Sequence, residues 1–214
     1  MISRTLQLIT SARLVAVVRL DDLSHAVKLA RALLAGGIVA QEFTLTNPDA
    51  PHAIGEVLAS LPEFQDGRAT LGAGSVRSIE EAQAAIEAGA QFLVTPTTIP
   101  AVIAGGREAG IPVIAGALTP TEIAGAWEAG APIVKVFPAR TLGPRYLRDV
   151  LAPMPYLKLM PTGGIDLSNL GAYLEQGAVA VGVGGKLLDK RVLEARDWRE
   201  ITRTARLYAE AAGG

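Results

Sequence analysis

The segments EAGAQFLV (residues 87–94), EAGIPVI (108–114) and EAGAPIV (128–134) repeat one pattern along the middle of the chain. Their glycines, at positions 89, 110 and 130, lie 21 and 20 residues apart. In each segment a helix-favouring stretch ends at a glycine and an apolar run follows, which is typical of a helix C-terminus, a short loop and a buried strand. EQGAVAV (175–181) has the same form. The pattern predicts a chain built of alternating helices and strands.

The apolar runs predict eight strands, short and buried on both faces. Strict alternation with helices favours a parallel sheet, and eight units favour closure into a TIM (β/α)₈ barrel in a single domain, residues 1–214. An extra helix is expected before the first strand and a last one at about 196–212. Capping boxes are predicted at Ser78 and at Thr119. The predicted strands are 14–20, 39–45, 70–75, 91–95, 112–116, 133–137, 157–161 and 179–183.

Composition excludes several classes of protein. The 20 Lys and Arg residues balance 21 Asp and Glu residues, which argues against nucleic acid or an anionic membrane as a partner. The absence of cysteine excludes disulfides, thiolate metal sites and a cysteine nucleophile, and it fits a cytoplasmic location. No targeting or membrane-spanning segment is expected. His25 and His52 are predicted to be surface residues, so no metal site is expected.

One lysine interrupts an apolar strand. Lys135 lies in IVKVFP (133–138), where a charged side chain is costly unless it is paired or used. It could reach the rim or pair with a carboxylate. It could also be a desolvated amine with a lowered pKa that attacks a carbonyl group and forms an imine. Lys158, in the seventh strand, is the rival nucleophile, and we expect it to point outward or toward the rim.

Glu42 is the matching carboxylate at the end of the second strand, in QEFTL (41–45). It is either the partner of a buried cation or a general acid/base. Arg19, at the end of the first strand, is either a rim ion pair or a clamp for a substrate carboxylate. Ser75 and Thr95 end the third and fourth strands and could offer hydroxyl groups to a pocket at this end of the barrel.

Paired glycines follow the last two strands. Gly163-Gly164 and Gly184-Gly185 would let backbone N–H groups approach an anion, and the loops after strands seven and eight are the usual phosphate site of this fold. Lys186 adds a cation there, or is a solvated lysine at a helix start.

With these residues together, nearly the whole chain resembles the family of 2-keto-3-deoxy-6-phosphogluconate aldolases, which includes 4-hydroxy-2-oxoglutarate aldolases. Five segments in order carry the resemblance: EFTLT (42–46), GAGSV (72–76), KVFPA (135–139), PTGG (161–164) and Gly184-Gly185.

The resemblance implies roles for single residues. It implies that Lys135 is the Schiff-base lysine and Glu42 the general acid/base. The four paired glycines correspond to the phosphate cradle, Phe137 and Thr162 to pocket-lining positions, and Ser75 to a place where a pyruvate-binding Thr is common.

Two positions depart from the family pattern. Thr46 stands where many members carry an Arg that holds the substrate carboxylate, and our hypothesis is that Arg19 takes over this role. Lys186 stands where a phosphate-contacting Ser is frequent.

The resemblance implies a class I aldolase that cleaves 2-keto-3-deoxy-6-phosphogluconate to pyruvate and glyceraldehyde 3-phosphate, without metal or organic cofactor and as a homotrimer. The galactonate epimer and 4-hydroxy-2-oxoglutarate are open as substrates. A sugar-phosphate epimerase or a thiamine-phosphate-synthase-like barrel is an alternative, and so is a non-catalytic binding subunit.

Overall fold

Eight parallel strands alternate with helices along the chain. A computed structural model describes residues 3–213. The strands are short, and all but one of their residues are buried, as expected for a sheet covered on both faces. Their bounds are β1 Leu14–Val18, β2 Ala40–Thr44, β3 Thr70–Gly74, β4 Leu93–Val94, β5 Val113–Ala117, β6 Ile133–Val136, β7 Leu159–Pro161 and β8 Val181–Val183.

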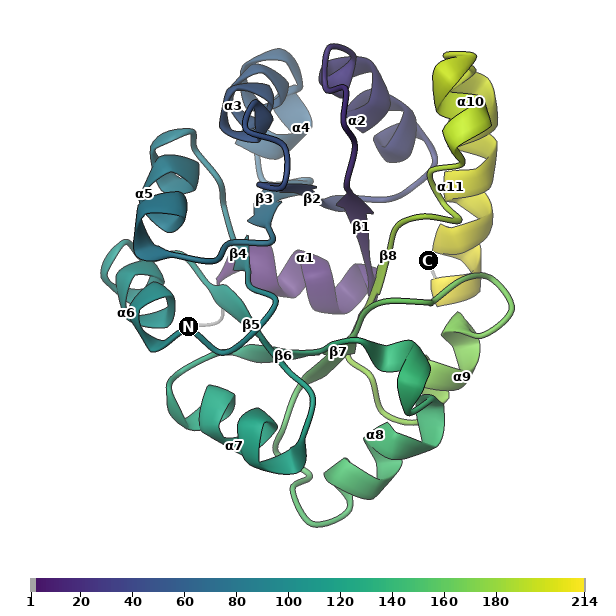
Figure 1. Ribbon diagram of the computed structural model, residues 1–214. Helices are drawn as coiled ribbons and strands as arrows, with labels where there is room; N and C mark the ends of the chain where they lie inside the picture. The colour runs from purple at the N-terminus through teal and green to yellow at the C-terminus, as the bar shows by residue number, and fades with distance from the viewer. Residues whose placement is uncertain (1–2, 214) are drawn as a thin grey trace.

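The strands form a TIM barrel. Neighbours in the sheet follow the order β7-β6-β5-β4-β3-β2-β1-β8, with β1 pairing to both β2 and β8. A parallel bridge between Thr162 and Gly182 joins the two ends of this order, just beyond β7 and within β8. Viewed along the barrel, the strands form an inner ring and the helices an outer one (Figure 1).

The helices of the outer ring end where the sequence predicts. Gly89, Gly110, Gly130 and Gly177 all adopt positive φ, which glycine reaches without steric cost. The helices are α1 Arg4–Ala12, α2 Ala26–Ala35, α3 Ala50–Ser60, α4 Pro62–Gln65, α5 Ile79–Glu87, α6 Pro100–Glu108, α7 Pro120–Glu128, the 3-10 turn η1 Ala139–Thr141, α8 Pro144–Leu151, α9 Leu170–Glu175, α10 Lys190–Glu194 and α11 Trp198–Ala212.

The two predicted capping boxes differ. At Thr119 the box is complete, because the Thr119 side chain accepts from the backbone N–H of Glu122 and the Glu122 carboxylate accepts from the backbone N–H of Thr119. At Ser78 only half of it forms. Ser78 accepts from the N–H of Glu81, but the Glu81 carboxylate binds Arg77 instead, through both its backbone N–H and its guanidinium.

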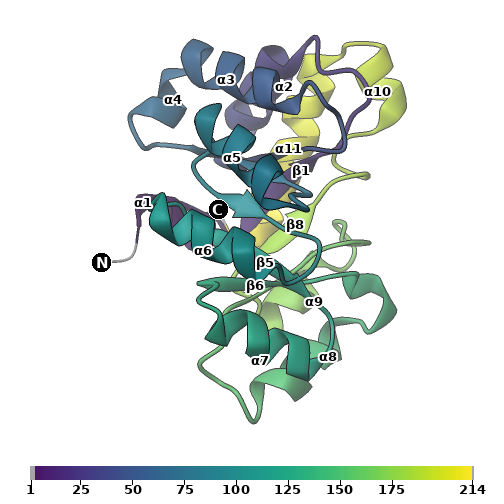
Figure 2. The same cartoon turned by 60° about the vertical axis from the view of Figure 1, so that its left-hand side comes forward.

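Helix α1 lies across one opening of the barrel (Figures 1 and 2). It contacts β1, β2 and β3, and its fully buried Ile9 joins the apolar side chains inside the barrel. The extra N-terminal helix is therefore confirmed, and it closes the end of the barrel where the strands begin. Within residues 3–213, no helix is both long and apolar enough to cross a membrane.

The eight predicted strands are all present, with ends that differ by up to two residues. β4 is the shortest, Leu93–Val94, because only these two residues hold ladder partners on β5. The last predicted helix begins two residues late, at Trp198, after Arg196 turns the chain at positive φ. The short helices α4 and α10 were not expected.

Candidate functional site

The interior of the barrel explains where the polar site lies. Its apolar layer is made by Ile9, Val15, Ala40, Phe92, Val94, Ile114, Ile133, Met160 and Ala180. Side chains two residues apart on a strand face the same side of the sheet. Glu42, Lys135 and Thr162 each come two residues after a member of this layer, toward the carboxyl ends of the strands. Three polar groups are thereby directed into the same end of the barrel.

Lys135 is buried, with 3% of its surface exposed. Its Nζ lies 5.1 Å from the centre of the Phe137 ring, and no carboxylate of the described chain lies within 4.0 Å of it. Burial lowers the pKa of the Lys135 amine, Glu42 raises it and Arg19 lowers it further. Since desolvation is the largest of these effects, the neutral and nucleophilic amine is favoured.

Glu42 is an isolated carboxyl group in the barrel interior. It is 1% exposed, and neither carboxyl oxygen has a hydrogen-bond partner among the described residues. Its side chain lies over Gly74, where an added Cβ would be 2.6 Å from Oε1. Burial raises the pKa of Glu42, against smaller opposing effects of Lys135 and Arg19. The two buried groups are therefore both favoured in their neutral forms, an amine and a carboxylic acid.

Arg19 reaches the same site from the end of β1. Its Nη2 donates to Ser75 Oγ over 3.2 Å, and it influences the pKa of both Glu42 and Lys135. Ser75 is buried and holds a φ of +57°, a conformation that is uncommon for residues with a Cβ and that often marks functional sites. A guanidinium held beside a buried amine can bind the carboxylate of a keto acid.

A cavity of about 650 Å³ opens at the carboxyl ends of the strands. It contains most of the predicted site and several residues that were not predicted. Its walls are Val17, Arg19, Lys135, Phe137, Arg140, Thr162, Gly163, Gly164, Ile165, Asp166, Gly182, Gly184, Gly185, Lys186, Leu188, Asp189 and Lys190.

The loop after β7 contributes a cradle to this cavity. Gly163 and Gly164 both adopt positive φ, +95° and +79°, so the backbone turns with no side chain in the way. Thr162 is 6% exposed and its Oγ1 has no hydrogen-bond partner among the described residues. Gly185, across the cavity, has open space where a Cβ would stand. Such a cradle can receive an anion.

Four predicted residues lie outside the walls of the cavity. One is Ser75, which Arg19 contacts from the wall. Glu42 lies deeper, beside Val17 in the neighbouring strand. Thr95 is fully buried, and its hydroxyl donates to the Thr97 carbonyl and accepts from the Gly116 N–H. Thr46 is exposed, and its hydroxyl pairs with that of Thr44 at 2.8 Å.

Lys158 lies away from the cavity, whereas two basic residues that were not predicted, Arg140 and Lys190, line it. Lys158 precedes β7, at the opposite end of the strand from the cavity, and does not line it. Arg140 lies in η1, which follows β6 closely, and Lys190 begins α10. For Arg140, a basic side chain shortly after the predicted strand 133–137 is a signal in the sequence, whereas Lys190 lies seven residues beyond the last predicted strand. Among residues 3–213, no group of three or more His, Cys, Asp or Glu could hold a metal ion.

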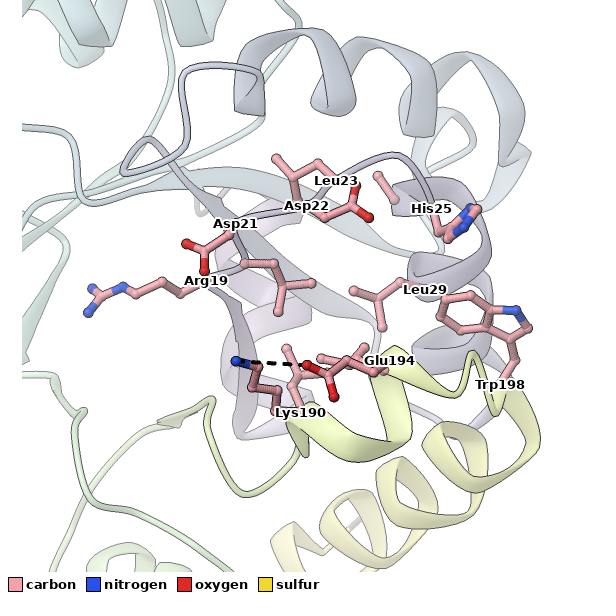
Figure 3. Close-up of a pocket in the computed structure, with 13 residues that line it drawn as sticks. Arg19, Asp21, Asp22, Leu23, His25, Leu29, Lys190, Glu194 and Trp198 are labelled. Atoms are coloured by element: carbon pink, nitrogen blue, oxygen red, sulfur yellow. Dashed lines mark ion pairs between the residues drawn. The ribbon is translucent and has the colours of Figure 1, made fainter.

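A second cavity, of about 420 Å³, adjoins the first between the β1–α2 loop and α10. Figure 3 shows Arg19 extending away from the wall that Leu29 and Trp198 form. The expectation that His25 is a surface residue is only partly met. His25 is half-buried because its ring packs edge-on against Trp198, with centroids 5.9 Å apart. His52 is exposed, as expected.

Comparison with known proteins gives the family of this chain. The model of the family "KDPG and KHG aldolase" matches residues 6–204. The 2-dehydro-3-deoxy-phosphogluconate aldolase of Treponema pallidum is 35% identical over 202 residues, 94% of each chain.

Solved structures are similar as well. The KDPG aldolase of Legionella pneumophila, with pyruvate captured as a covalent carbinolamine, has a TM-score of 0.85 at 28% identity and covers 93% of this chain and 95% of that one. A chain of a designed protein cage, made by fusing symmetric oligomeric domains, has a TM-score of 0.83 at 28% identity, over 92% of this chain and 71% of that one. The chain therefore belongs to the KDPG and KHG aldolase family and is a lyase of the aldolase type.

Proposed function

We propose that the chain is a class I aldolase that cleaves 2-keto-3-deoxy-6-phosphogluconate to pyruvate and glyceraldehyde 3-phosphate, with Lys135 as the nucleophile. One observation carries the proposal. Lys135 is a buried amine that forms no ion pair with any residue from 3 to 213, and it lies at the wall of a cavity large enough for a small substrate. The carbinolamine of the Legionella pneumophila relative supports the same chemistry.

In the first half of the reaction, the neutral amine of Lys135 attacks the C2 ketone and forms a carbinolamine. Glu42, whose pKa is raised by burial, acts as the acid and donates a proton to the carbinolamine hydroxyl. Water leaves and an iminium ion remains. Glu42 is now a carboxylate, close to a cation that its charge stabilises.

In the second half, the Glu42 carboxylate takes the proton of the C4 hydroxyl group. The C3–C4 bond breaks, its electron pair moves to the iminium, and an enamine and an aldehyde result. Glu42 then returns the proton to C3. Water hydrolyses the new iminium to pyruvate and the free Lys135 amine, and the proton that this releases restores the acid form of Glu42. One carboxyl group thus serves each proton transfer in turn. It is free to do so because neither of its oxygens has a hydrogen-bond partner within residues 3–213.

The remaining contacts are proposals on the same geometry. Arg19, held by Ser75, binds the C1 carboxylate in place of an arginine at position 46. Phe137 and Thr162 line the pocket. The backbone of the Gly163-Gly164 and Gly184-Gly185 turns, with Lys186, receives the phosphate. Thr95, whose hydroxyl is already bonded twice, supports Gly116 on the strand next to Lys135.

The test is borohydride reduction in the presence of pyruvate, followed by intact mass measurement and peptide mapping. We expect a pyruvyl adduct on Lys135 that Lys135→Ala abolishes and Lys158→Ala, the matched control, retains. An adduct on Lys158, or none, would overturn the assignment. Cleavage of 2-keto-3-deoxy-6-phosphogluconate, its galactonate epimer and 4-hydroxy-2-oxoglutarate is then compared by coupled pyruvate assay. No turnover of the first would overturn the proposed substrate.

We also propose that the protein assembles as a homotrimer. The number of three chains comes from the family resemblance, and the similar chain in a cage built from symmetric oligomeric domains supports a symmetric oligomer. Light scattering after gel filtration measures the mass directly, and three times the 22.2 kDa of one chain is the expected result. A monomer at micromolar concentration would contradict this proposal without affecting the aldolase assignment.

A further inference from the structure

Arg140 contacts the glycine cradle, the Gly163-Gly164 turn after β7, through both its backbone and its side chain. Its backbone N–H donates to the Gly163 carbonyl over 3.0 Å. Its aliphatic stem covers Gly164, where an added Cβ would lie 2.5 Å from Arg140 Cβ and 3.3 Å from Cδ. The absence of a side chain at Gly164 is thus what lets the stem lie flat on the loop. The side chain lines the cavity from there.

The charges around the cradle are predominantly positive. Arg140, Lys186 and Lys190 line this part of the cavity with Asp166 and Asp189. The two aspartates accept backbone hydrogen bonds from Ser168 and Arg191 in their own loops.

The three cations are not equally available. Lys190 forms an exposed ion pair with Glu194 over 3.8 Å, as the dashed line in Figure 3 marks. Within the described residues, Arg140 and Lys186 make no ion pair. Arg140 and Lys186 are therefore the cations left to meet a bound anion.

We propose that Arg140 is a specificity residue that favours substrates ending in a phosphate dianion over those ending in a carboxylate. The proposal rests on the aldolase function above and deepens it. A guanidinium offers two parallel N–H groups to a phosphate, and its attraction grows with the charge of the anion. A 4-hydroxy-2-oxoglutarate molecule ends in a single carboxylate and is shorter than 2-keto-3-deoxy-6-phosphogluconate with its phosphate. Arg140 therefore discriminates by both charge and reach, with Lys186 as a second point charge.

The test compares kcat and KM for 2-keto-3-deoxy-6-phosphogluconate and 4-hydroxy-2-oxoglutarate in wild type, Arg140→Ala and Arg140→Lys. Arg148→Ala is the matched control, since Arg148 is an exposed arginine on α8 outside the cavity. We expect Arg140→Ala to raise KM for the phosphorylated substrate about tenfold, or about 1.4 kcal/mol, with little change for 4-hydroxy-2-oxoglutarate. Arg140→Lys should fall between, because it keeps the charge but loses the paired N–H groups.

Two further measurements separate this inference from the proposed function. Pyruvate trapping on Lys135 should be unchanged in Arg140→Ala, which shows that the variant folds with an intact amine. Calorimetric titration with inorganic phosphate should show weaker binding by Arg140→Ala than by wild type and Arg148→Ala. Equal phosphate affinity in all three proteins, or an equal rise of KM for both substrates, would overturn the role of Arg140. Failure of wild type to cleave the phosphorylated substrate would instead overturn the function.

Discussion

Gly74→Ala should disable the acid/base while leaving the nucleophile in place. The three atoms nearest to an added Cβ all belong to Glu42, at 2.6 Å for Oε1, 2.8 Å for Cδ and 3.3 Å for Cγ. Ordinary contact begins at about 3.4 Å, so the carboxyl group must move by about 0.8 Å. A misplacement on the order of 1 Å can cost about 100-fold in rate. Overpacking of an interior site costs about 1–3 kcal/mol of stability.

The expected result is a kcat for keto acid cleavage that falls about 100-fold, measured by coupling pyruvate release to lactate dehydrogenase. Borohydride should still trap pyruvate on Lys135, because the three atoms nearest to the added methyl group all belong to Glu42. Trapping should be slower than in wild type, since Glu42 is the acid that helps the iminium to form. Thermal unfolding should show a moderately less stable but folded protein.

Gly125→Ala is the control for a glycine substitution as such. Gly125 lies in α7, and an added Cβ there meets no atom within 4 Å. This variant should keep its kcat and gain about 0.5–1 kcal/mol from its higher helix propensity. If folded Gly74→Ala retains activity within threefold of wild type, then the position of Glu42 over Gly74 does not matter for catalysis and the reasoning is refuted.

Three other predictions follow from charge and capping. Because burial lowers the pKa of Lys135, kcat/KM should rise with pH and level off below about pH 10.4, the usual lysine value. A kcat/KM that still rises above that pH would contradict the assignment. Because burial raises the pKa of Glu42, the folded protein keeps a proton that the unfolded chain releases above about pH 4.3. Wild type should therefore lose stability relative to Glu42→Gln as pH rises from there through the folded-state pKa, and a Tm difference independent of pH would exclude this. Thr119→Ala removes the N-cap of α7 and should cost about 1 kcal/mol in denaturant unfolding with kcat unchanged, whereas a lower kcat would connect this cap to the site.

The strands and the two central residues could be predicted because their signals are local. An apolar run bounded by a glycine specifies a buried strand whichever helices cover it. Lys135 and Glu42 stand out because each interrupts such a run, and a buried charge needs a function or a partner. The barrel rule then places both at the carboxyl ends of the strands.

Arg140 and His25 could not be predicted because their positions depend on distant segments. The direction of Arg140 is set by the carbonyl of Gly163 and the bare Cα of Gly164, both on the next strand–helix loop. The burial of His25 depends on Trp198, more than 170 residues later in the chain. Neither arrangement leaves a periodic pattern in the residues around it.

Two of the glycines in the site have the same structural purpose, although sequence alone suggests different ones. Gly74 leaves room for the Glu42 side chain, and Gly164 leaves room for the stem of Arg140. Glycine inside or just after a strand weakens it, so its presence needs a compensating reason. Gly74 on β3 lets the Glu42 side chain of β2 lie across its backbone. Gly164, after β7, does the same for the Arg140 side chain, which comes from the turn after β6. A polar group in an apolar strand and a glycine on the neighbouring strand or loop should therefore be considered as one unit when such barrels are searched for sites.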